Sequence, residues 1–238
     1  MTPDEVKTWI DTIFESFRHA DDADIDASLP ASVTADTRLG KLYEAYVLAY
    51  VLRRLKNEEG FDIRLRSADG YLHLRSSPGP IKPNFSHFDL RDRNSGATLK
   101  AWTDIEFVTL GHHLRTNSGQ RKQGRPVASD RHELDIVLVG SEVTGYPRHH
   151  EVVLGIECKH VARFEKAIVR AALGVRRELS LLTAPTETGF ETWPRTTVPA
   201  SPPSVLIVYS TQSKISDFEQ AGEAFGVDFE HLPFGKWP

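Results

Sequence analysis

The stretches Glu133-Leu-Asp-Ile-Val-Leu-Val139 and Glu151-Val-Val-Leu-Gly-Ile-Glu-Cys-Lys159 decide the fold of this chain. Each is a mostly apolar run of strand length that carries a few charged residues. The link between them is short and polar, so the two predicted strands are expected to pair as a hairpin. Because side chains alternate along a strand, Glu157 and Lys159 point to one face, and their apolar neighbours point to the other.

Helical and extended patterns continue on both sides of this hairpin. Apolar residues at helical spacing predict one helix from Pro3 to Arg18 and a second over about 37–57. After the hairpin the pattern predicts a long helix, a buried strand, a helix and a short final strand, at 163–182, 205–210, 213–225 and 227–232. This order is typical of the α/β class, with a mixed central sheet flanked by helices.

The region between the second helix and the hairpin is rich in strand patterns. Four stretches have such a pattern: 61–66, 71–75, 85–91 and 98–109. The first two flank Asp69-Gly70 and are expected to form a hairpin around that turn. Two other stretches lack any period and are predicted to be irregular loops: 111–131 and 183–204.

Composition narrows the class of protein. A chain of 238 residues with 39% hydrophobic residues can bury a core without disulfides, and one domain over 1–238 is expected. Its single cysteine, Cys158, excludes an internal disulfide and a four-cysteine zinc site. The sequence has no signal-peptide pattern and no apolar run of the ~18 residues that a membrane helix needs. A cytoplasmic protein without membrane contact is therefore expected.

Charge is distributed unevenly. The formal net charge is −4, from 29 Lys and Arg against 33 Asp and Glu, whereas a non-specific nucleic-acid binder is usually basic. Acidic residues dominate from Asp4 to Asp36, and basic residues dominate over 112–131. A basic segment on an acidic protein is a candidate contact for phosphate groups. The alternative is a solvated surface loop.

The charged residues within the apolar hairpin point to chemistry. Asp135 interrupts one strand, and Glu157 and Lys159 end the other. A strand covered by helices needs a partner or a metal ion for such charges. Two carboxylates side by side repel each other unless a cation lies between them, and oxygen ligands favour Mg²⁺. Lys159 would then lie near the attacking water or a phosphate. A purely structural ion pair is the alternative.

Asp135 followed by Glu157-Cys158-Lys159 resembles the Asp…Glu-x-Lys motif of the PD-(D/E)XK nuclease superfamily, which has the restriction-endonuclease-like fold. The order of strand, turn, strand and long helix is similar too. In that family a preceding helix carries a metal-binding Glu, and Gly40-Lys-Leu-Tyr-Glu44 resembles this element. The proline that often precedes the Asp is absent, and His132-Glu133-Leu134 stands in its place.

The resemblance implies a division of the chain. The restriction-endonuclease-like core is expected at about 37–58 and 131–232. The segment of about 61–130 matches no part of the common core, and we expect it to be an inserted β-rich segment that contacts the substrate.

The resemblance also implies a function, a metal-dependent DNA endonuclease that hydrolyses phosphodiester bonds in restriction, defence or DNA processing. Its catalytic residues would be Asp135, Glu157, Lys159 and Glu44. The metal ligands would be Asp135, Glu157 and Glu44, holding Mg²⁺ with Mn²⁺ as a substitute. The alternative is a catalytically inactive nucleic-acid-binding module on the same fold.

Several basic residues are expected to contact DNA: Arg115, Arg121, Lys122, Arg125, Arg131, Lys166 and Arg170. Cleavage of both strands by one site per chain would favour a two-fold homodimer. A different class of enzyme would use Asp104 and Glu106 with His112 and His113 as a zinc or second metal site. Adjacent histidines on a strand point in opposite directions, which disfavours that site. Glu133, on the same face as Asp135, is either an additional metal carboxylate or a solvated residue at the strand start.

Overall fold

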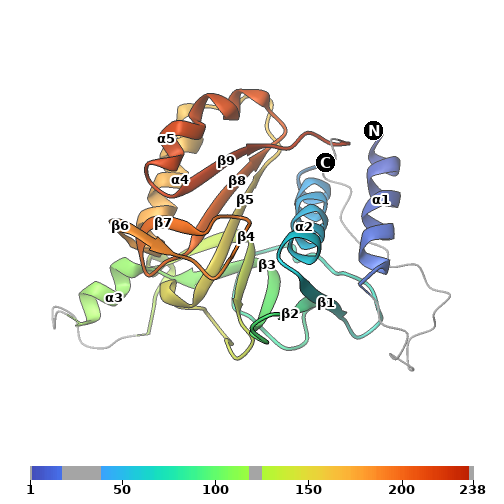
Figure 1. Cartoon of the computed structure of the whole chain (residues 1–238), viewed down its shortest axis with the longest axis horizontal. Coiled ribbons are helices and arrows are strands. Elements are labelled where there is room, and N and C mark those ends of the chain that lie inside the picture. Colours follow the sequence, from blue (N-terminus) through green and yellow to red (C-terminus); the bar gives the residue numbers. More distant parts are fainter. Residues whose placement is uncertain (1, 18–38, 118–124, 236–238) are drawn as a thin grey trace.

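A seven-stranded sheet forms the centre of the protein (Figure 1). The computed structural model describes residues 2–17, 39–117 and 125–235. The strand order is β1-β2-β3-β4-β5-β8-β9, and β6 and β7 form a separate two-stranded sheet. The bounds are β1 Phe61–Arg66, β2 His87–Asp92, β3 Thr98–Val108, β4 Arg131–Gly140, β5 Val152–Lys159, β6 Leu181–Glu187, β7 Thr197–Ser201, β8 Val205–Ser210 and β9 Val227–His231.

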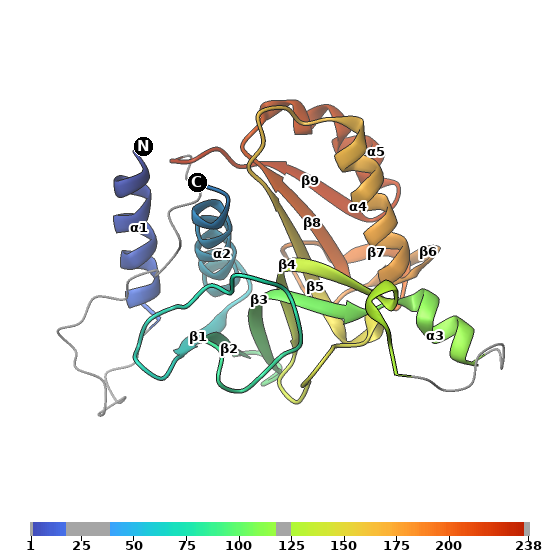
Figure 2. The same ribbon diagram turned by 180° about the vertical axis from the view of Figure 1, so that it is seen from behind.

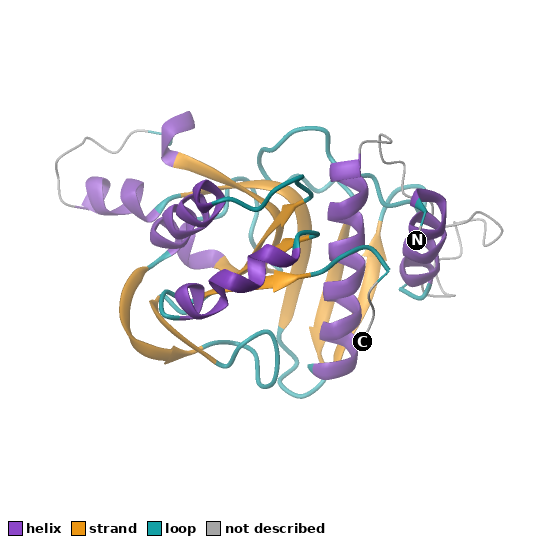
Figure 3. Ribbon diagram, turned by 90° about the horizontal axis from the view of Figure 1, so that it is seen from above, coloured by secondary structure: helices purple, strands orange, loops and turns teal. Residues whose placement is uncertain are grey.

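Helices cover the central sheet on both faces. The helix bounds are α1 Pro3–Glu15, α2 Leu39–Glu58, α3 Leu110–Asn117, α4 Lys166–Leu179 and α5 Glu219–Glu223. α1 and α2 lie together on one side, and α4 and α5 lie on the other, as the views from behind and from above also show (Figures 2 and 3). Among the described residues no helix is both long and apolar enough to cross a membrane.

The sheet is mixed. Strands β1 to β5 pair antiparallel in succession, whereas β5, β8 and β9 run parallel. Parallel neighbours need a crossover, and α4 lies in the connection from β5 to β8. The predicted α/β class with a mixed sheet between helices is therefore confirmed.

Alternating burial explains why the two deciding strands lie at the centre. Ile136 and Leu138 of β4 belong to a core shared with α1 and α2. Val137 and Val139, which point the other way, belong to a second core shared with α4. The two strands pair as predicted, with Ile136 opposite Ile156. Apolar side chains on both faces of a strand require layers on both sides, which the helices supply.

One predicted hairpin is wrong. β1 pairs with β2, not with 71–75, which forms no strand. The side chain of Ser86 provides hydrogen-bond partners for the backbone of this stretch instead. Its Oγ accepts a hydrogen bond from the His73 backbone N–H at 3.2 Å and donates one to the Tyr71 carbonyl at 3.2 Å. A side chain that bonds the backbone in this way competes with a strand ladder.

The two predicted irregular loops also differ from the structure. The stretch 183–204 contains most of the β6–β7 hairpin, in which Pro185 is tolerated because the strand lies in a two-stranded sheet with free edges. The stretch 111–131 begins inside α3, where Thr116 Oγ1 donates a hydrogen bond to the His112 carbonyl. Arg121 and Lys122 lie outside the described residues.

The segment 61–130 is part of the central sheet. It supplies β1, β2 and β3, and β3 pairs with β4 along almost its whole length. The loop before β2 also runs beside β3, where Gly79 bridges Ile105. This segment therefore places its side chains directly beside those of the predicted core.

We expect Gly222→Ala to destabilise the fold. A Cβ at Gly222 would lie 2.4 Å from both the Phe229 side chain and the Val227 carbonyl, which cannot both move. The free energy of unfolding should fall by about 1–3 kcal/mol in urea titrations. The matched control is Gly174→Ala in α4, whose Cβ would meet nothing within 4 Å and should stabilise the helix slightly. Equal stability of the two variants would contradict this packing.

Candidate metal centre

Asp135, Glu157 and Lys159 come together at the end of the β4–β5 hairpin. The last paired residues, Ile136 and Ile156, place Asp135 opposite Glu157. Lys159 Nζ lies 2.5 Å from Glu157 Oε2 and 3.6 Å from Asp135 Oδ2. Asp135 Oδ2 also accepts a hydrogen bond of 2.6 Å from the Cys158 backbone N–H, which fixes the direction of the carboxylate. The structure thus assembles the three residues that the sequence singled out.

A second arrangement brings Asp135 together with Glu44 and Asp104. One carboxylate oxygen of each lies within 4.8 Å of the other two. The three residues come from α2, β3 and β4, so the site exists only when the sheet and the helix are assembled. Three carboxylates at this separation are a ligand set for a hard divalent cation such as Mg²⁺.

Asp104 is the best-fixed member of the set. Its side chain is 1% exposed; Oδ1 accepts a hydrogen bond of 2.6 Å from Lys41 Nζ, and Oδ2 is buried without a partner among the described residues. A buried carboxylate oxygen with nothing to bind is costly. A metal ion placed against it would supply the missing interaction, so the residues present fit a cation.

The backbone at Asp104 is unusual. Its φ of +52° is the one positive φ of a described residue other than glycine. The carbonyl of Asp104 accepts a hydrogen bond from Gly79 N–H at 3.2 Å, and Gly79 in turn accepts one from Glu106 N–H at 3.0 Å. This left-handed conformation costs about 1–3 kcal/mol and persists only where the surroundings impose it, which is common at functional sites.

Lys41 is a second ammonium group within the cluster. Its Nζ lies 2.6 Å from Glu44 Oε2 and 2.6 Å from Asp104 Oδ1. The carboxylates of Glu44, Asp104, Asp135 and Glu157 carry four formal negative charges, and Lys41 and Lys159 carry two positive ones. When all four carboxyl groups are ionised, two negative charges remain, and one divalent cation would balance them.

Burial and crowding change the proton affinity of these groups. The pKa of Glu44 is raised to about 7, first by burial and then by the neighbouring Asp135 and Asp104, against the attraction of Lys41. Burial likewise raises the pKa of Asp104 and that of Glu157, where it outweighs the attraction of Lys159. The pKa of Lys159 is raised by Glu157 and Asp135 although burial opposes this, so its ammonium stays charged at neutral pH.

Asp104 is the candidate ligand that sequence reasoning did not place with Glu44 and Asp135. It was considered only with Glu106 and the two histidines, and the structure does not assemble that alternative. His112 Nδ1 lies 3.3 Å from Asp130, and the His113 ring packs on His149, so neither joins Asp104. The sequence offered only a weak signal, a carboxylate in a partly apolar strand pattern that Glu106 shares, and this pattern does not specify that Asp104 meets Asp135.

Glu157 and Glu133 lie at the margin of the cluster. Glu157 is not among the three residues whose oxygens converge, because its carboxylate is held by Lys159. Glu133 is exposed, but its pKa is raised by partial burial and by Asp135 and Asp104. It is therefore close enough to these carboxylates to add to the negative potential of the site.

The predicted DNA-contacting residues are spread over several elements. Arg115 on α3 pairs with Asp130, while Arg131 Nε lies 3.3 Å from Glu106 and its guanidinium covers the Tyr146 ring at 4.3 Å. Three others are exposed: Arg125, Lys166 and Arg170. Lys166 is the first residue of α4, which follows β5 and its Lys159 after a short link.

No family model, curated protein or solved structure matches this chain.

We expect the stability of the metal-free protein to fall as pH rises. The pKa of Glu44 is raised from 4.5 to about 7 on folding, so the folded state binds the proton more tightly. This contribution is complete below about 4.5, the unfolded pKa, and is lost as pH rises through about 7. The melting temperature in EDTA should therefore drop over this range, and Mg²⁺ should raise it more at high pH than at low pH. Glu44→Gln should flatten the profile, whereas the exposed Glu142→Gln should not.

We expect Asp104→Asn to weaken binding of Mn²⁺. Loss of one carboxylate should lower the affinity at least about tenfold, since even residues that only support a ligand matter by 10- to 100-fold. Electron paramagnetic resonance of free Mn²⁺ gives the measurement, with Glu106→Gln, two residues away and paired with Arg131, as the control. Unchanged affinity in Asp104→Asn would show that the ion does not bind at this cluster.

Proposed function

We propose that this protein is a metal-dependent DNA endonuclease that hydrolyses phosphodiester bonds. The observation that supports it most is the convergence of the Asp104, Glu44 and Asp135 carboxylates, with the Lys159 ammonium beside Asp135 and with Asp104 Oδ2 buried without a partner among the described residues. An oxygen-rich cation site next to a fixed ammonium is the arrangement that phosphodiester hydrolysis uses.

The proposal assigns the cation to Glu44, Asp104 and Asp135, with Glu157 at the margin. Bound there, Mg²⁺ would polarise a phosphate oxygen and make an attacking water more acidic. The protein's own contribution is to hold the carboxylates apart from bulk water at fixed positions. Asp135 is oriented by the Cys158 N–H, and Asp104 and Glu44 are oriented by Lys41.

Lys159 acts as a charged group in this proposal. Its ammonium is held by Glu157 at the edge of the carboxylate cluster and remains protonated at neutral pH. It can therefore donate hydrogen bonds to an incoming water or to a phosphate oxygen and offset the charge that develops during attack. A group that stays protonated is unsuited to remove a proton from water.

The fold proposed here is the restriction-endonuclease-like core. Its support is the order of elements around the site: α2 with Glu44, β4 with Asp135, β5 ending in Glu157 and Lys159, and then α4. The exposed cations Arg125, Lys166 and Arg170 support DNA as the substrate, because phosphate contacts dominate protein–DNA affinity. We include Mn²⁺ as a substitute for Mg²⁺.

The test is cleavage of plasmid and short duplex and single-stranded DNA with Mg²⁺ or Mn²⁺. Lys159→Met and Asp135→Asn should each reduce the rate by at least about 100-fold, as loss of one stabilising group in an active site commonly does. The control is Lys214→Met, an exposed lysine on the short helical turn after β8, which should leave the rate unchanged.

Two outcomes would count against the enzyme. If every DNA substrate stays intact with both metal ions, the activity is refuted. The second outcome is salt-dependent DNA binding that is equal in the wild type and in Lys159→Met, with no cleavage by either protein. The chain would then be the inactive binding module.

A further inference from the structure

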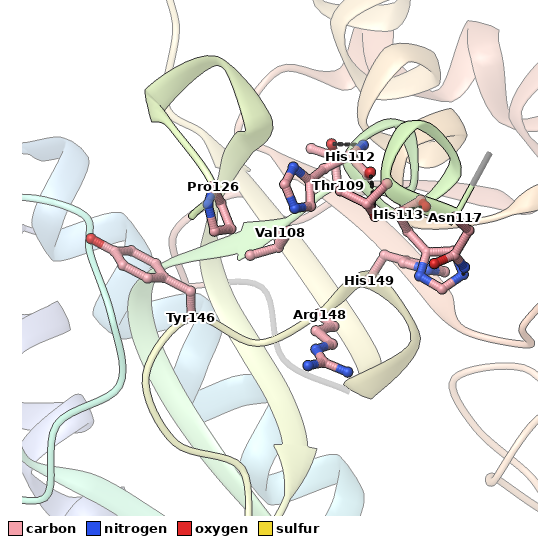
Figure 4. A pocket seen from close by; sticks show the side chains of 10 residues that line it. Val108, Thr109, His112, His113, Asn117, Pro126, Tyr146, Arg148 and His149 are labelled. Carbon is pink, nitrogen blue, oxygen red and sulfur yellow. Dashed lines mark hydrogen bonds between the residues drawn. The ribbon is translucent and has the colours of Figure 1, made fainter. Parts of the chain in front are cut away.

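A second pocket lies about four residues along β3 from the metal centre (Figure 4). It has a volume of about 580 Å³ and lies where the end of β3 meets α3 and the loop before β5. Figure 4 shows His112, His113 and Asn117 on one side and Tyr146, Arg148 and His149 along the adjoining loop. The volume is within the range of small-molecule sites in proteins.

The lining favours an anionic ligand over a metal ion. None of the ten described residues that line it is acidic, and Asp130, a carboxylate beside His112, is also paired with Arg115. Arg148 is exposed, and its guanidinium makes no hydrogen bond or ion pair with a described residue. The rings of His113, His149 and His150 lie 5.1–6.2 Å apart, yet the carboxylate cluster is the one described group whose ligand atoms converge as a metal requires.

His149 gives the pocket a hydrogen-bonding requirement. Its side chain is 4% exposed, and Nδ1 contacts the Leu179 carbonyl at 3.0 Å, so Nδ1 carries the proton. Its other nitrogen, Nε2, is then an acceptor, and it is buried without a partner among the described residues. A ligand that brings an N–H group to this end of the pocket would satisfy it.

The strand β3 connects this pocket to the carboxylate cluster. Val108 lies four residues beyond Asp104 on β3, a distance of about 13 Å along a strand. Its backbone N–H donates a hydrogen bond of 2.7 Å to the Pro147 carbonyl, which fixes the loop that carries Tyr146 and Arg148. The guanidinium of Arg131, the first residue of β4, covers the Tyr146 ring at the margin of the pocket. A separation of this size is spanned by a few nucleotides of a DNA strand, so one strand can reach both places.

We propose that this pocket binds one unpaired nucleotide of the DNA substrate. The phosphate contacts Arg148, and the base lies against His113 with an N–H donor directed to His149. The inference rests on the proposed function, because it treats the strand at the metal centre as the strand that reaches the pocket. A nucleotide provides at once the negative charge, the flat ring and the N–H donor that the lining requires.

The experiment measures binding in EDTA, so that it does not depend on cleavage or on the metal ion. The probes are a short DNA duplex with one extrahelical 2-aminopurine nucleotide and the same duplex fully paired. The extrahelical probe should bind about tenfold more tightly, with a change in 2-aminopurine fluorescence, since stacking of one base contributes about 5- to 150-fold. Arg148→Gln and His113→Ala should each remove the preference.

The matched control is Lys214→Gln, which removes a cation from a different cavity, beside α4. It should keep the preference. The proposal is overturned if the two duplexes bind equally, or if Arg148→Gln retains the preference. The alternative is that the histidines of the pocket bind a metal ion. The proposal is also overturned if the wild type shows no preference between the duplexes but binds Co²⁺, and His113→Ala abolishes the binding of Co²⁺. If the protein cleaves no DNA but still prefers the extrahelical probe, the nuclease proposal fails and the proposal for the pocket stands.

Discussion

The mutual repulsion of carboxylates at one end of the sheet is the constraint on which the site depends. Glu44, Asp104 and Asp135 have oxygens within 4.8 Å of one another, in surroundings that raise the pKa of the first two. Such an arrangement persists only with compensating positive charge. Lys41 supplies part of it beside Asp104 and Lys159 supplies part of it beside Asp135, and the remaining negative charge is what a divalent cation would balance.

The sheet makes this convergence possible by its register. Antiparallel pairing of β4 with β5 sets Asp135 beside Glu157, and pairing with β3 sets Asp104 on the other side of Asp135. The helix α2 then adds Glu44 from outside the sheet. Asp135 lies on the central strand β4, and each of the other carboxylates comes from a different neighbour of that strand. A shift of one residue in the pairing with β3 or β5 would turn a carboxylate to the opposite face.

The sequence predicted what depends on local alternation and missed what depends on distant pairing. Asp135, Glu157 and Lys159 could be predicted because a two-strand hairpin has few possible registers. Asp104 could not, because its role requires the pairing of β3 with β4 and a left-handed backbone that no pattern specifies. The stretch 71–75 was misassigned for a similar reason, since Ser86, a residue distant in sequence, satisfies its backbone.

The strand β3 contributes to both candidate sites. Asp104 near its middle places a carboxylate in the cluster, and Val108 at its end anchors the loop that carries Arg148. A rigid strand fixes the separation of two binding points far better than a loop does. Under the two proposals, a polymer bound at one point would be presented to the other at a set spacing, and the 61–130 segment, which supplies β3, would determine which part of a strand reaches the carboxylates.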